Sequence, residues 1–224
     1  GLSSVTANSL DAVSDRDFAA EFEAAAALAM THLSRMAEDL ILWTGDEYRL
    51  FALSDATATG SSMMPQKKNP DSLELTRGKA GRVIGNLVAT LTTMKGLPLS
   101  YDRDLQETQQ PLFETADALE LCLAAVQEVI AGLRLLPEKQ RGAIDPSSLA
   151  TDVAEELVRR GAAFRTAHER AARWSRKAAE GKRDLREVVW TEAPELRSFA
   201  ESLSPESSVR RRDETSAHRN LRPT

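Results

Sequence analysis

The first part of the chain carries apolar residues at steps of three and four, a spacing that places side chains on one face of an α-helix. The first such run starts after Ser14 and Asp17, which resemble a capping box, and ends near Gly45. Its apolar positions are Phe18, Phe22, Ala25, Ala29, Leu33, Met36, Leu40 and Trp43. At ~1.5 Å per residue this helix is roughly 40 Å long, a length suited to an elongated bundle.

Two further long helices are predicted in the same region. Asn69 is expected to cap the second, which begins at Pro70 and is stopped by Gly96. Its apolar positions are Leu73, Ala80, Ile84, Leu87, Leu91 and Met94, and Gly78, Gly81 and Gly85 are expected to permit a tight helix contact. The third helix follows Pro111 and ends at Pro137. Its inward positions are predicted to be Leu112, Leu119, Leu123, Val126, Ile130 and Leu133. Together they predict an all-α fold built on a long-helix bundle.

The pattern shortens in the last third of the chain. Residues 145–147 form an N-terminal helix signal, and short helices are expected at 152–160 and 164–179. We therefore expect two domains: a central bundle segment, residues 1–136, and a small helical C-terminal domain, residues 137–224.

The tail of the chain, residues 210–224, is polar and is predicted to be disordered. It opens with the run Arg210-Arg211-Arg212, which is read as a solvated basic segment. The chain as a whole has 29 Lys and Arg against 34 Asp and Glu, a formal net charge of −5. This balance argues against a surface for nucleic acid or anionic membrane.

Cysteine usage and apolar runs narrow the class of protein further. The single cysteine, Cys122, excludes an internal disulfide and sits in a helical apolar pattern, which predicts a buried structural thiol. It also favours a reducing, cytoplasmic compartment. The longest nearly apolar stretch, residues 24–30, is far shorter than the ~20 residues that span a bilayer. We expect no membrane partner.

The segment with the clearest chemistry is Gly60-Ser61-Ser62-Met63-Met64-Pro65-Gln66-Lys67-Lys68-Asn69-Pro70. A loop of small residues leads into the N-terminus of a long helix, and two lysines and an asparagine lie where the loop meets the helix. Free backbone N–H groups, the helix dipole and a lysine together form a site for a carboxylate or phosphate. An ordinary helix cap preceded by a solvated basic turn explains the same residues equally well without a ligand.

This segment is similar to the signature GSSxMPxKxNP of the superfamily that contains argininosuccinate lyase, adenylosuccinate lyase, fumarase and aspartase. The sequence from Met64 to Glu74, preceded by Leu53-Ser54-Asp55, resembles argininosuccinate lyase in particular. Residues 8–18, 95–107 and 151–169 resemble the same family. The resemblance implies a cytoplasmic homotetramer around a 20-helix bundle. It also implies a lyase that uses no cofactor or metal and eliminates fumarate from argininosuccinate to give arginine, the last step of arginine biosynthesis.

The resemblance assigns roles to residues of this sequence. By similarity, the catalytic residues are Ser61, Lys67 and Glu74, with Ser61 handling the carbon-bound proton. Glu74 would orient a histidine that arrives from another subunit. The residues that contact the substrate by similarity are Asn69, Tyr101, Gln106 and Gln109.

Two departures from the family pattern affect function. The family's paired histidine motifs lie in an N-terminal half that is absent here, so the isolated chain is expected to be inactive. His32, His168 and His218 do not replace them, and His168 is expected to serve packing or capping. Gln109 stands where the family usually has a lysine that helps bind a substrate carboxylate. Losing one charge-assisted contact costs about 1.5 to 3 kcal/mol.

Two alternative functions remain open on these grounds. Gln109 and the missing half favour a non-catalytic relative, such as the crystallin-like structural proteins that share the fold. A sister lyase that releases fumarate from adenylosuccinate is the other alternative. The intact set of Ser61, Lys67 and Asn69 argues against a purely structural role, since nothing structural requires that combination.

Overall fold

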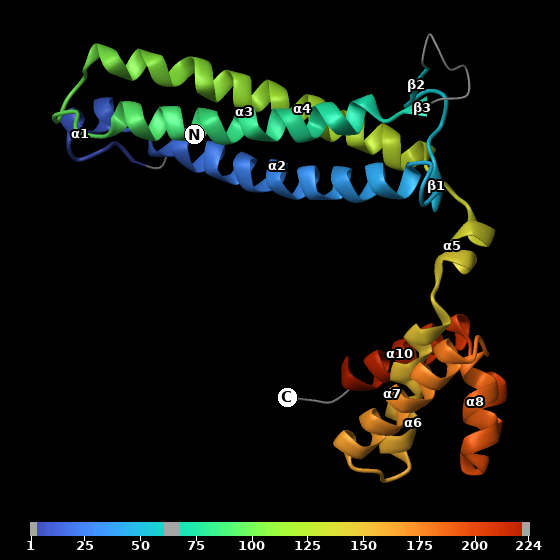
Figure 1. The fold of residues 1–224 in the computed structure, drawn as a ribbon. Helices are drawn as coiled ribbons and strands as arrows, with labels where there is room; N and C mark the ends of the chain where they lie inside the picture. Colours follow the sequence, from blue (N-terminus) through green and yellow to red (C-terminus); the bar gives the residue numbers. More distant parts are fainter. Residues whose placement is uncertain (1–3, 61–67, 221–224) are drawn as a thin grey trace. The chain divides into compact units, whose positions relative to one another are not determined.

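The structure, a computed structural model, describes residues 4–60 and 68–220, with side chains described up to residue 213. The described chain is mainly α-helical, which confirms the predicted all-α fold (Figure 1). Its α-helices are α1 (Ser9–Ser14), α2 (Asp17–Thr44), α3 (Asp71–Met94), α4 (Gln109–Gly132), α5 (Pro137–Ala143), α6 (Ala150–Arg159), α7 (Phe164–Glu180), α8 (Leu185–Glu192), α9 (Arg197–Ser202) and α10 (Pro205–Asn220). The shorter elements are the 3-10 helices η1 (Arg103–Thr108), η2 (Pro146–Leu149) and η3 (Pro194–Leu196) and the strands β1 (Phe51–Ala52), β2 (Thr59–Gly60), β3 (Lys68–Asn69) and β4 (Arg134–Leu135).

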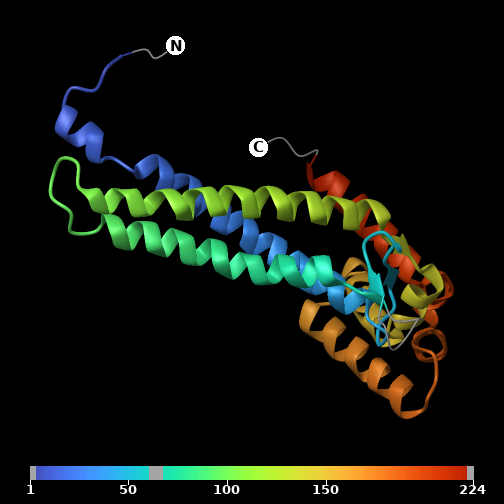
Figure 2. The ribbon, with the colours of Figure 1, turned by 90° about the horizontal axis from the view of Figure 1, so that it is seen from above.

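The chain divides into two compact units, residues 1–140 and 141–224. In the first unit α2, α3 and α4 pack against one another and lie side by side (Figure 2). Helix α2 has 28 residues and, at ~1.5 Å per residue, is about 42 Å long, as its apolar spacing predicts. The residues that the three helices bury together are Ala26, Ala27, Met30, Ala80, Val83, Ala118 and Cys122. The predicted bundle of long helices is confirmed.

The faces that these helices bury differ from the predicted apolar faces. Most of the inner contacts are made by small or polar side chains, including Ala19, Ala26, Thr76, Ala80, Thr90, Thr115 and Ala118. Several larger residues predicted to face inward are exposed: Phe18, Phe22, Ile84, Leu91, Leu123 and Ile130. Small side chains let the helix axes approach closely, so the bulky apolar side chains are left on other faces. The glycines Gly78, Gly81 and Gly85 also meet open space, so the tight contact expected for them is not made with any part of the chain that the structure describes.

The start of α2 also differs from the prediction. Ser14 does not cap this helix, because it is the last residue of α1, where its hydroxyl donates to backbone carbonyls of the preceding turn. The N-cap position of α2 is Arg16, and the carboxylate of Asp15 accepts the N–H of Asp17 at 2.8 Å. Short polar side chains bond to nearby backbone both where a helix ends and where one begins, so the sequence pattern is ambiguous here.

The segment that follows α2 is docked on the C-terminal end of α4. Strand β1 pairs antiparallel with β4, with Phe51 opposite Leu135 and Ala52 opposite Arg134. Leu53 is buried in a cluster that also contains Ala37, Leu40, Leu73 and Val129. Residues more than 80 positions apart in the sequence therefore meet at this end of the unit.

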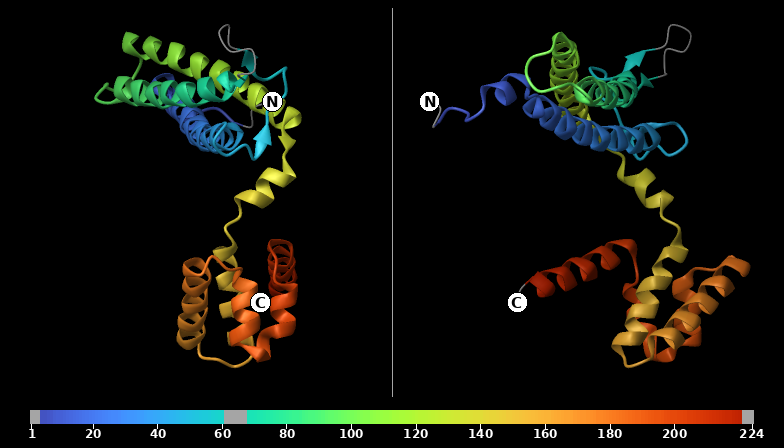
Figure 3. Two further views of the ribbon diagram at one scale, coloured as in Figure 1. Left: turned by 45° about the vertical axis from the view of Figure 1, so that its right-hand side comes forward. Right: turned by 90° about the vertical axis from the view of Figure 1, so that its left-hand side faces the viewer.

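The second unit has its own core, formed by α6 to α9 and the turns between them. Helices α6 and α7 form a hairpin (Figure 3), which turns at Gly161 with a φ of +96°. Before it, the carboxylate of Asp145 accepts the N–H of Ser147 at 2.8 Å and caps η2. The short helices predicted for this region are confirmed.

Residues 210–220 belong to α10, so the disorder predicted from residue 210 is wrong for them. Asp152 of α6 is 3% exposed and explains the difference. Its carboxylate accepts a hydrogen bond from Ser208 at 2.9 Å and from Arg211 at 3.2 Å, and Arg212 lies 3.7 Å away. The basic run therefore binds a buried carboxylate rather than being only a solvated segment.

Two sequence-based expectations concern burial and membranes. Cys122 is buried, as predicted, and burial raises the pKa of its thiol, which suits a structural residue. Among the described residues, no helix combines the length and the apolar character needed to cross a membrane.

Candidate active site

Two short strands close the base of the segment predicted to carry the chemistry. Strands β2 and β3 pair antiparallel, with Thr59 opposite Asn69 and Gly60 opposite Lys68. Ser61 and Lys67, the predicted catalytic residues, lie between these strands in the sequence and outside the described residues. The two-stranded ribbon of β2 and β3 therefore fixes Gly60 and Lys68, the described residues on either side of the segment 61–67.

Polar contacts reinforce this ribbon. The ammonium group of Lys68 lies 2.5 Å from the carboxylate of Asp55, and the hydroxyl of Thr59 donates to Asp71 in the first turn of α3. The hydrogen bond and charge of Lys68 lower the pKa of Asp55. Both side chains of the ion pair are largely exposed, so the pair contributes more to geometry than to stability. One of the two adjacent lysines is thus engaged by an aspartate of the same chain.

Asn69 does not cap α3 as predicted. It lies in β3, and the N-cap position is taken by Pro70, whose carbonyl accepts the N–H groups of Leu73 and Glu74 at 2.9 and 3.1 Å. Proline fixes the turn into the helix through its ring, so no side-chain cap is needed there. Glu74 is exposed one turn into α3, on the same end of the unit as Asn69.

The remaining predicted substrate-binding residues lie at the other end of the unit. Tyr101 and Gln106 lie in the connection from α3 to α4, Gln109 is the first residue of α4, and all three are exposed. This connection is at the far end of the unit from β2 and β3 (Figure 1). Helix α3 has 24 residues and separates the connection from Asn69 by about 36 Å at ~1.5 Å per residue. Within a single chain the described site residues therefore form two separate groups.

Buried contacts hold this second group in place. Leu105 and Thr108 of η1, which directly precede Gln106 and Gln109 in the sequence, are buried. The Thr108 hydroxyl donates to the Leu105 carbonyl at 2.8 Å. The amide of Asn86 on α3 donates to the Pro111 carbonyl at 3.3 Å and to the Thr115 hydroxyl at 3.2 Å. These bonds fix the start of α4 against α3, so the exposed glutamines project from a rigid support.

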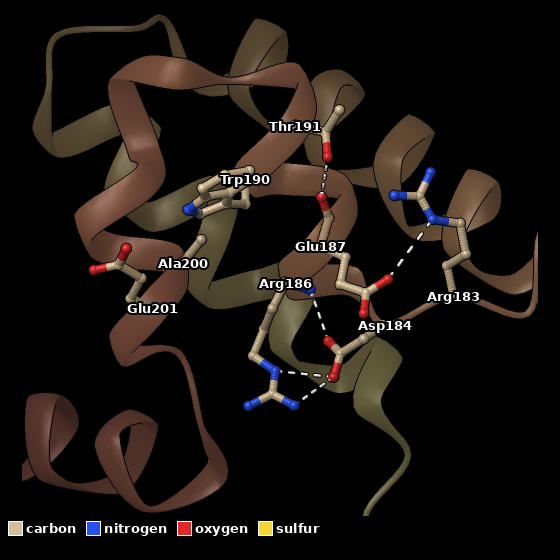
Figure 4. A pocket seen from close by; sticks show the side chains of 8 residues that line it. All are labelled: Arg183, Asp184, Arg186, Glu187, Trp190, Thr191, Ala200 and Glu201. Atoms are coloured by element: carbon tan, nitrogen blue, oxygen red, sulfur yellow. Dashed lines mark hydrogen bonds and ion pairs between the residues drawn. The ribbon is translucent and has the colours of Figure 1, made fainter.

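The second unit contains a hollow of about 440 Å³ beside Trp190 (Figure 4). Four of its five charged residues pair with one another: Arg186 binds Asp184 at 2.5 Å, and Arg183 lies 3.8 Å from Glu187. The guanidinium of Arg197 lies 4.7 Å from the centre of the Trp190 ring. The fifth charged residue is Glu201, so both arginines of this described lining already face carboxylates.

A second hollow of about 470 Å³ lies between α6 and α7. His168 lines it, and its ring lies 6.2 Å from that of Phe164. Alanines form much of its wall, including Ala154 and Ala171. Among the residues that the structure describes, no group of three or more His, Cys, Asp or Glu side chains is arranged to hold a metal ion.

Two features of the site escaped the sequence analysis. The first is the ion pair of Asp55 with Lys68: an aspartate and a lysine that flank a loop of small residues indicate an ion pair across the base of the loop. The contact between Ser54 and Gly132 joins residues 78 positions apart, and no local pattern could predict it.

Comparisons with known proteins place these features in a family. Residues 1–85 match the family model described as a lyase, and residues 147–210 match the model described as the argininosuccinate lyase C-terminal region. The argininosuccinate lyase of Roseiflexus sp. (strain RS-1) is 54% identical over 180 residues, which cover 80% of this chain and 40% of that protein. The argininosuccinate lyase of Thiobacillus denitrificans is 51% identical over 201 residues, 89% of this chain and 43% of that protein. The chain thus spans about two fifths of the length of these curated relatives.

Solved structures agree with this assignment. The EDDS lyase in complex with formate is 31% identical and aligns with a TM-score of 0.72, covering 85% of this chain and 40% of that one. A class II fumarase from Schistosoma mansoni, 19% identical with a TM-score of 0.70 over 88% of this chain and 40% of its own, shares the fold. With the signature segment and the long helices, these matches establish that the chain belongs to the argininosuccinate lyase family of the fumarase/aspartase superfamily.

Proposed function

We propose that the protein is an argininosuccinate lyase, which eliminates fumarate from argininosuccinate and leaves arginine. The observation that carries the proposal is the identity of 51–54% to curated argininosuccinate lyases over 80–89% of this chain. The matched region includes the signature segment with Ser61, Lys67 and Asn69 unchanged from the family pattern.

The reaction defines what the site must supply. A proton leaves the carbon next to a carboxylate, and the nitrogen of the leaving group departs from the neighbouring carbon. The intermediate carbanion spreads its charge into that carboxylate and becomes dianionic. Fixed positive charge and N–H donors stabilise such an intermediate, and a lysine at a helix N-terminus provides both.

The signature segment supplies these groups in the proposal. Ser61 removes the carbon-bound proton, which requires that Lys67 and nearby dipoles stabilise its alkoxide form. Asn69 contacts the substrate from the base of the segment, and Glu74 orients a histidine supplied by another subunit. The ion pair with Asp55 engages Lys68, one of the two adjacent lysines, and the proposal assigns the other, Lys67, to the substrate.

The substrate-binding residues complete the site from the other end of the unit. Tyr101, Gln106 and Gln109 contact the substrate in the proposal, about 36 Å from Asn69 of the same chain at ~1.5 Å per helical residue. The site is therefore built where ends of different copies meet. We propose a cytoplasmic homotetramer in which each active site combines segments of three subunits.

The uncovered faces of the three long helices support this assembly. Large apolar side chains remain exposed on all three, among them Phe18 on α2, Ile84 and Leu91 on α3, and Leu123 and Ile130 on α4. So many large apolar side chains exposed on three neighbouring helices are typical of a surface that packs against another chain. The open space at Gly78, Gly81 and Gly85 allows a neighbouring helix to approach α3 closely.

Fumarate absorbance tests the proposal directly. The longest reading frame that contains this chain is expressed and given argininosuccinate, with adenylosuccinate as the control substrate. The proposal predicts fumarate from argininosuccinate alone. Fumarate from adenylosuccinate instead would identify a sister lyase and contradict the proposal.

Mutation of Ser61 tests its role. Ser61→Ala is expected to abolish turnover because no other group of the proposed set can take the proton. Circular dichroism and the mass of the assembly should be unchanged. Retained fumarate release in a protein of normal helicity would remove Ser61 from the mechanism.

Gln109 favours one further candidate, a non-catalytic relative that keeps the fold as a stable oligomer. Where the family usually has a lysine, the glutamine cannot supply its charge. A folded tetramer that releases no fumarate from either substrate would favour this candidate.

A further inference from the structure

Gly132, the last residue of α4, lies against Ser54 in the segment between α2 and the signature. A Cβ atom at position 132 would lie 2.6 Å from the hydroxyl oxygen of Ser54 and 3.0 Å from its Cβ. The Ser54 hydroxyl would have to rotate away from this Cβ, and the Ser54 Cβ, which cannot rotate, would have to move by a few tenths of an ångström. Glycine at position 132 lets Ser54 keep its place without this displacement.

Ser54 belongs to a tight turn that leads directly to the base of the signature. The Thr57 N–H donates to the Ser54 carbonyl at 3.2 Å, and the two hydroxyl groups lie 2.9 Å apart. Two residues further on, Thr59 begins β2 and donates to Asp71 at the start of α3. A displacement of Ser54 is therefore passed on to the ribbon through a short and internally bonded segment.

Neighbouring contacts prevent the segment from shifting freely to relieve a clash. On one side of Ser54, Leu53 is 4% exposed in its apolar cluster, and Ala52 pairs with Arg134. On the other side, Asp55 is paired with Lys68 across the ribbon. Ser54 is thus held between two fixed points, with the end of α4 beneath it.

We propose that Gly132 is a positioning residue for the fumarate-releasing reaction: it sets where the turn at Ser54 lies on the end of α4, and hence where the β2–β3 ribbon lies at the start of α3. The inference rests on the proposed function, since its effect is expressed through Asn69 in β3. Gly132 itself touches no substrate. Misplacement of reacting groups by about 1 Å can cost on the order of a hundredfold in rate.

The test is a pair of substitutions in the longest reading frame that contains the chain. Gly132→Ala should lower kcat at least about tenfold and change KM less than about threefold, because substrate still binds while the reacting groups are displaced. Ser54→Gly removes the two Ser54 atoms that the new methyl group would crowd, and the third neighbour, the Thr57 hydroxyl at 3.9 Å, is at ordinary contact distance. The double variant Gly132→Ala/Ser54→Gly should therefore turn over faster than Gly132→Ala and at the rate of Ser54→Gly alone, which loses only the hydroxyl contact with Thr57.

The matched control is Gly142→Ala in α5, where an added Cβ meets nothing within 4 Å. It should leave kcat and KM unchanged. Loss of kcat in Gly132→Ala that Ser54→Gly fails to rescue would overturn the inference, as would an unaltered kcat in Gly132→Ala. If Gly132→Ala does not fold, Ser54→Thr enlarges the side chain that lies against Gly132 and should lower kcat in the same way.

Failure of the proposed function would be recognised separately. A wild-type protein that releases no fumarate contradicts the proposed lyase, whatever its variants do. The contact would then be judged by hydrogen exchange at Thr57, whose N–H is bonded to the Ser54 carbonyl. Gly132→Ala should speed this exchange, and adding Ser54→Gly to Gly132→Ala should slow it again. Equal exchange in the wild type and in Gly132→Ala would contradict the positioning role as well.

Discussion

Two buried carboxylates of this protein, Asp152 and Glu23, differ in their hydrogen bonding, and the difference has measurable consequences. Asp152 has bonds from Ser208 and Arg211, so its buried carboxylate is compensated. Glu23 of α2 is fully buried, and neither of its carboxylate oxygens has a hydrogen-bond partner among the described residues. Burial raises the pKa of Glu23, and the nearby Thr90 hydroxyl offsets this only in part.

The raised pKa of Glu23 makes stability depend on pH. Since the folded-state pKa lies above that of the unfolded chain, about 4.3, stabilisation is complete below that value and is lost as pH rises through the folded-state pKa. Glu23→Leu should therefore raise the free energy of unfolding at pH 8, by about 1–3 kcal/mol, and change it less at pH 4. Urea denaturation at both pH values measures this.

The control for Glu23 is Glu21→Gln, which changes an exposed glutamate of the same helix. It should leave the pH dependence of unfolding as in the wild type. A Glu23→Leu protein that is equally destabilised at both pH values would show that the carboxylate is compensated in the assembled protein.

Gln109 gives a second prediction at the residue scale. Gln109→Lys should lower KM for argininosuccinate about tenfold or more, because a charge-assisted bond to a substrate carboxylate is worth about 1.5–3 kcal/mol. Steady-state kinetics measure the change. Gln110→Lys adds the same charge one residue away, where the amide already donates to Glu114, and should not lower KM. An unchanged KM in Gln109→Lys would contradict the proposal that position 109 contacts a substrate carboxylate.

At the scale of elements, the sequence predicted the long helices well and their contacts poorly. The ends of α2 near Gly45 and of α3 near Gly96 follow from glycine and from the spacing of apolar residues. The buried faces of the helices cannot be derived in this way. Apolar spacing marks every helix face that carries apolar side chains, including those that remain exposed in a single chain. Close packing through residues such as Ala26 and Ala80 then selects which face turns inward.

The same reasoning explains the elements that were missed. The pairing of β1 with β4 depends on residues more than 80 positions apart, and each strand is only two residues long. The tail was predicted to be disordered because its composition is polar, yet α10 is held by the buried carboxylate of Asp152. Local sequence patterns do not contain either contact.

The attachment of α10 to α6 can be tested through Asp152. Asp152→Ala should lower the free energy of unfolding of the second unit by about 2–4 kcal/mol, since it removes a buried charge from its partners. Limited proteolysis should then cut within α10 earlier than in the wild type. Asp213→Asn, an exposed aspartate of α10, serves as the control. Unchanged stability and proteolysis of Asp152→Ala would show that α10 is held by other contacts.

At the scale of the whole molecule, the separation of the candidate site residues is the central feature. Asn69 and Glu74 lie at one end of α3, whereas Tyr101, Gln106 and Gln109 lie beyond the other. The sequence supplied the identity of these residues through the resemblance, but their distance within one chain follows only from the straight course of α3. In the proposed assembly a site shared between copies reconciles the two, and the exposed apolar side chains of the long helices are the surface proposed for it.

Subunit mixing tests this account most directly. The variants Ser61→Ala and Gln106→Ala are each expected to be inactive, because each removes a different part of the site. When equal amounts are unfolded and reassembled together, sites that draw these two residues from different copies should be intact in about one quarter of cases, so fumarate release should return to roughly that fraction of the wild-type rate. No recovery in a correctly assembled mixed tetramer would show that one copy supplies both residues and would contradict the shared site.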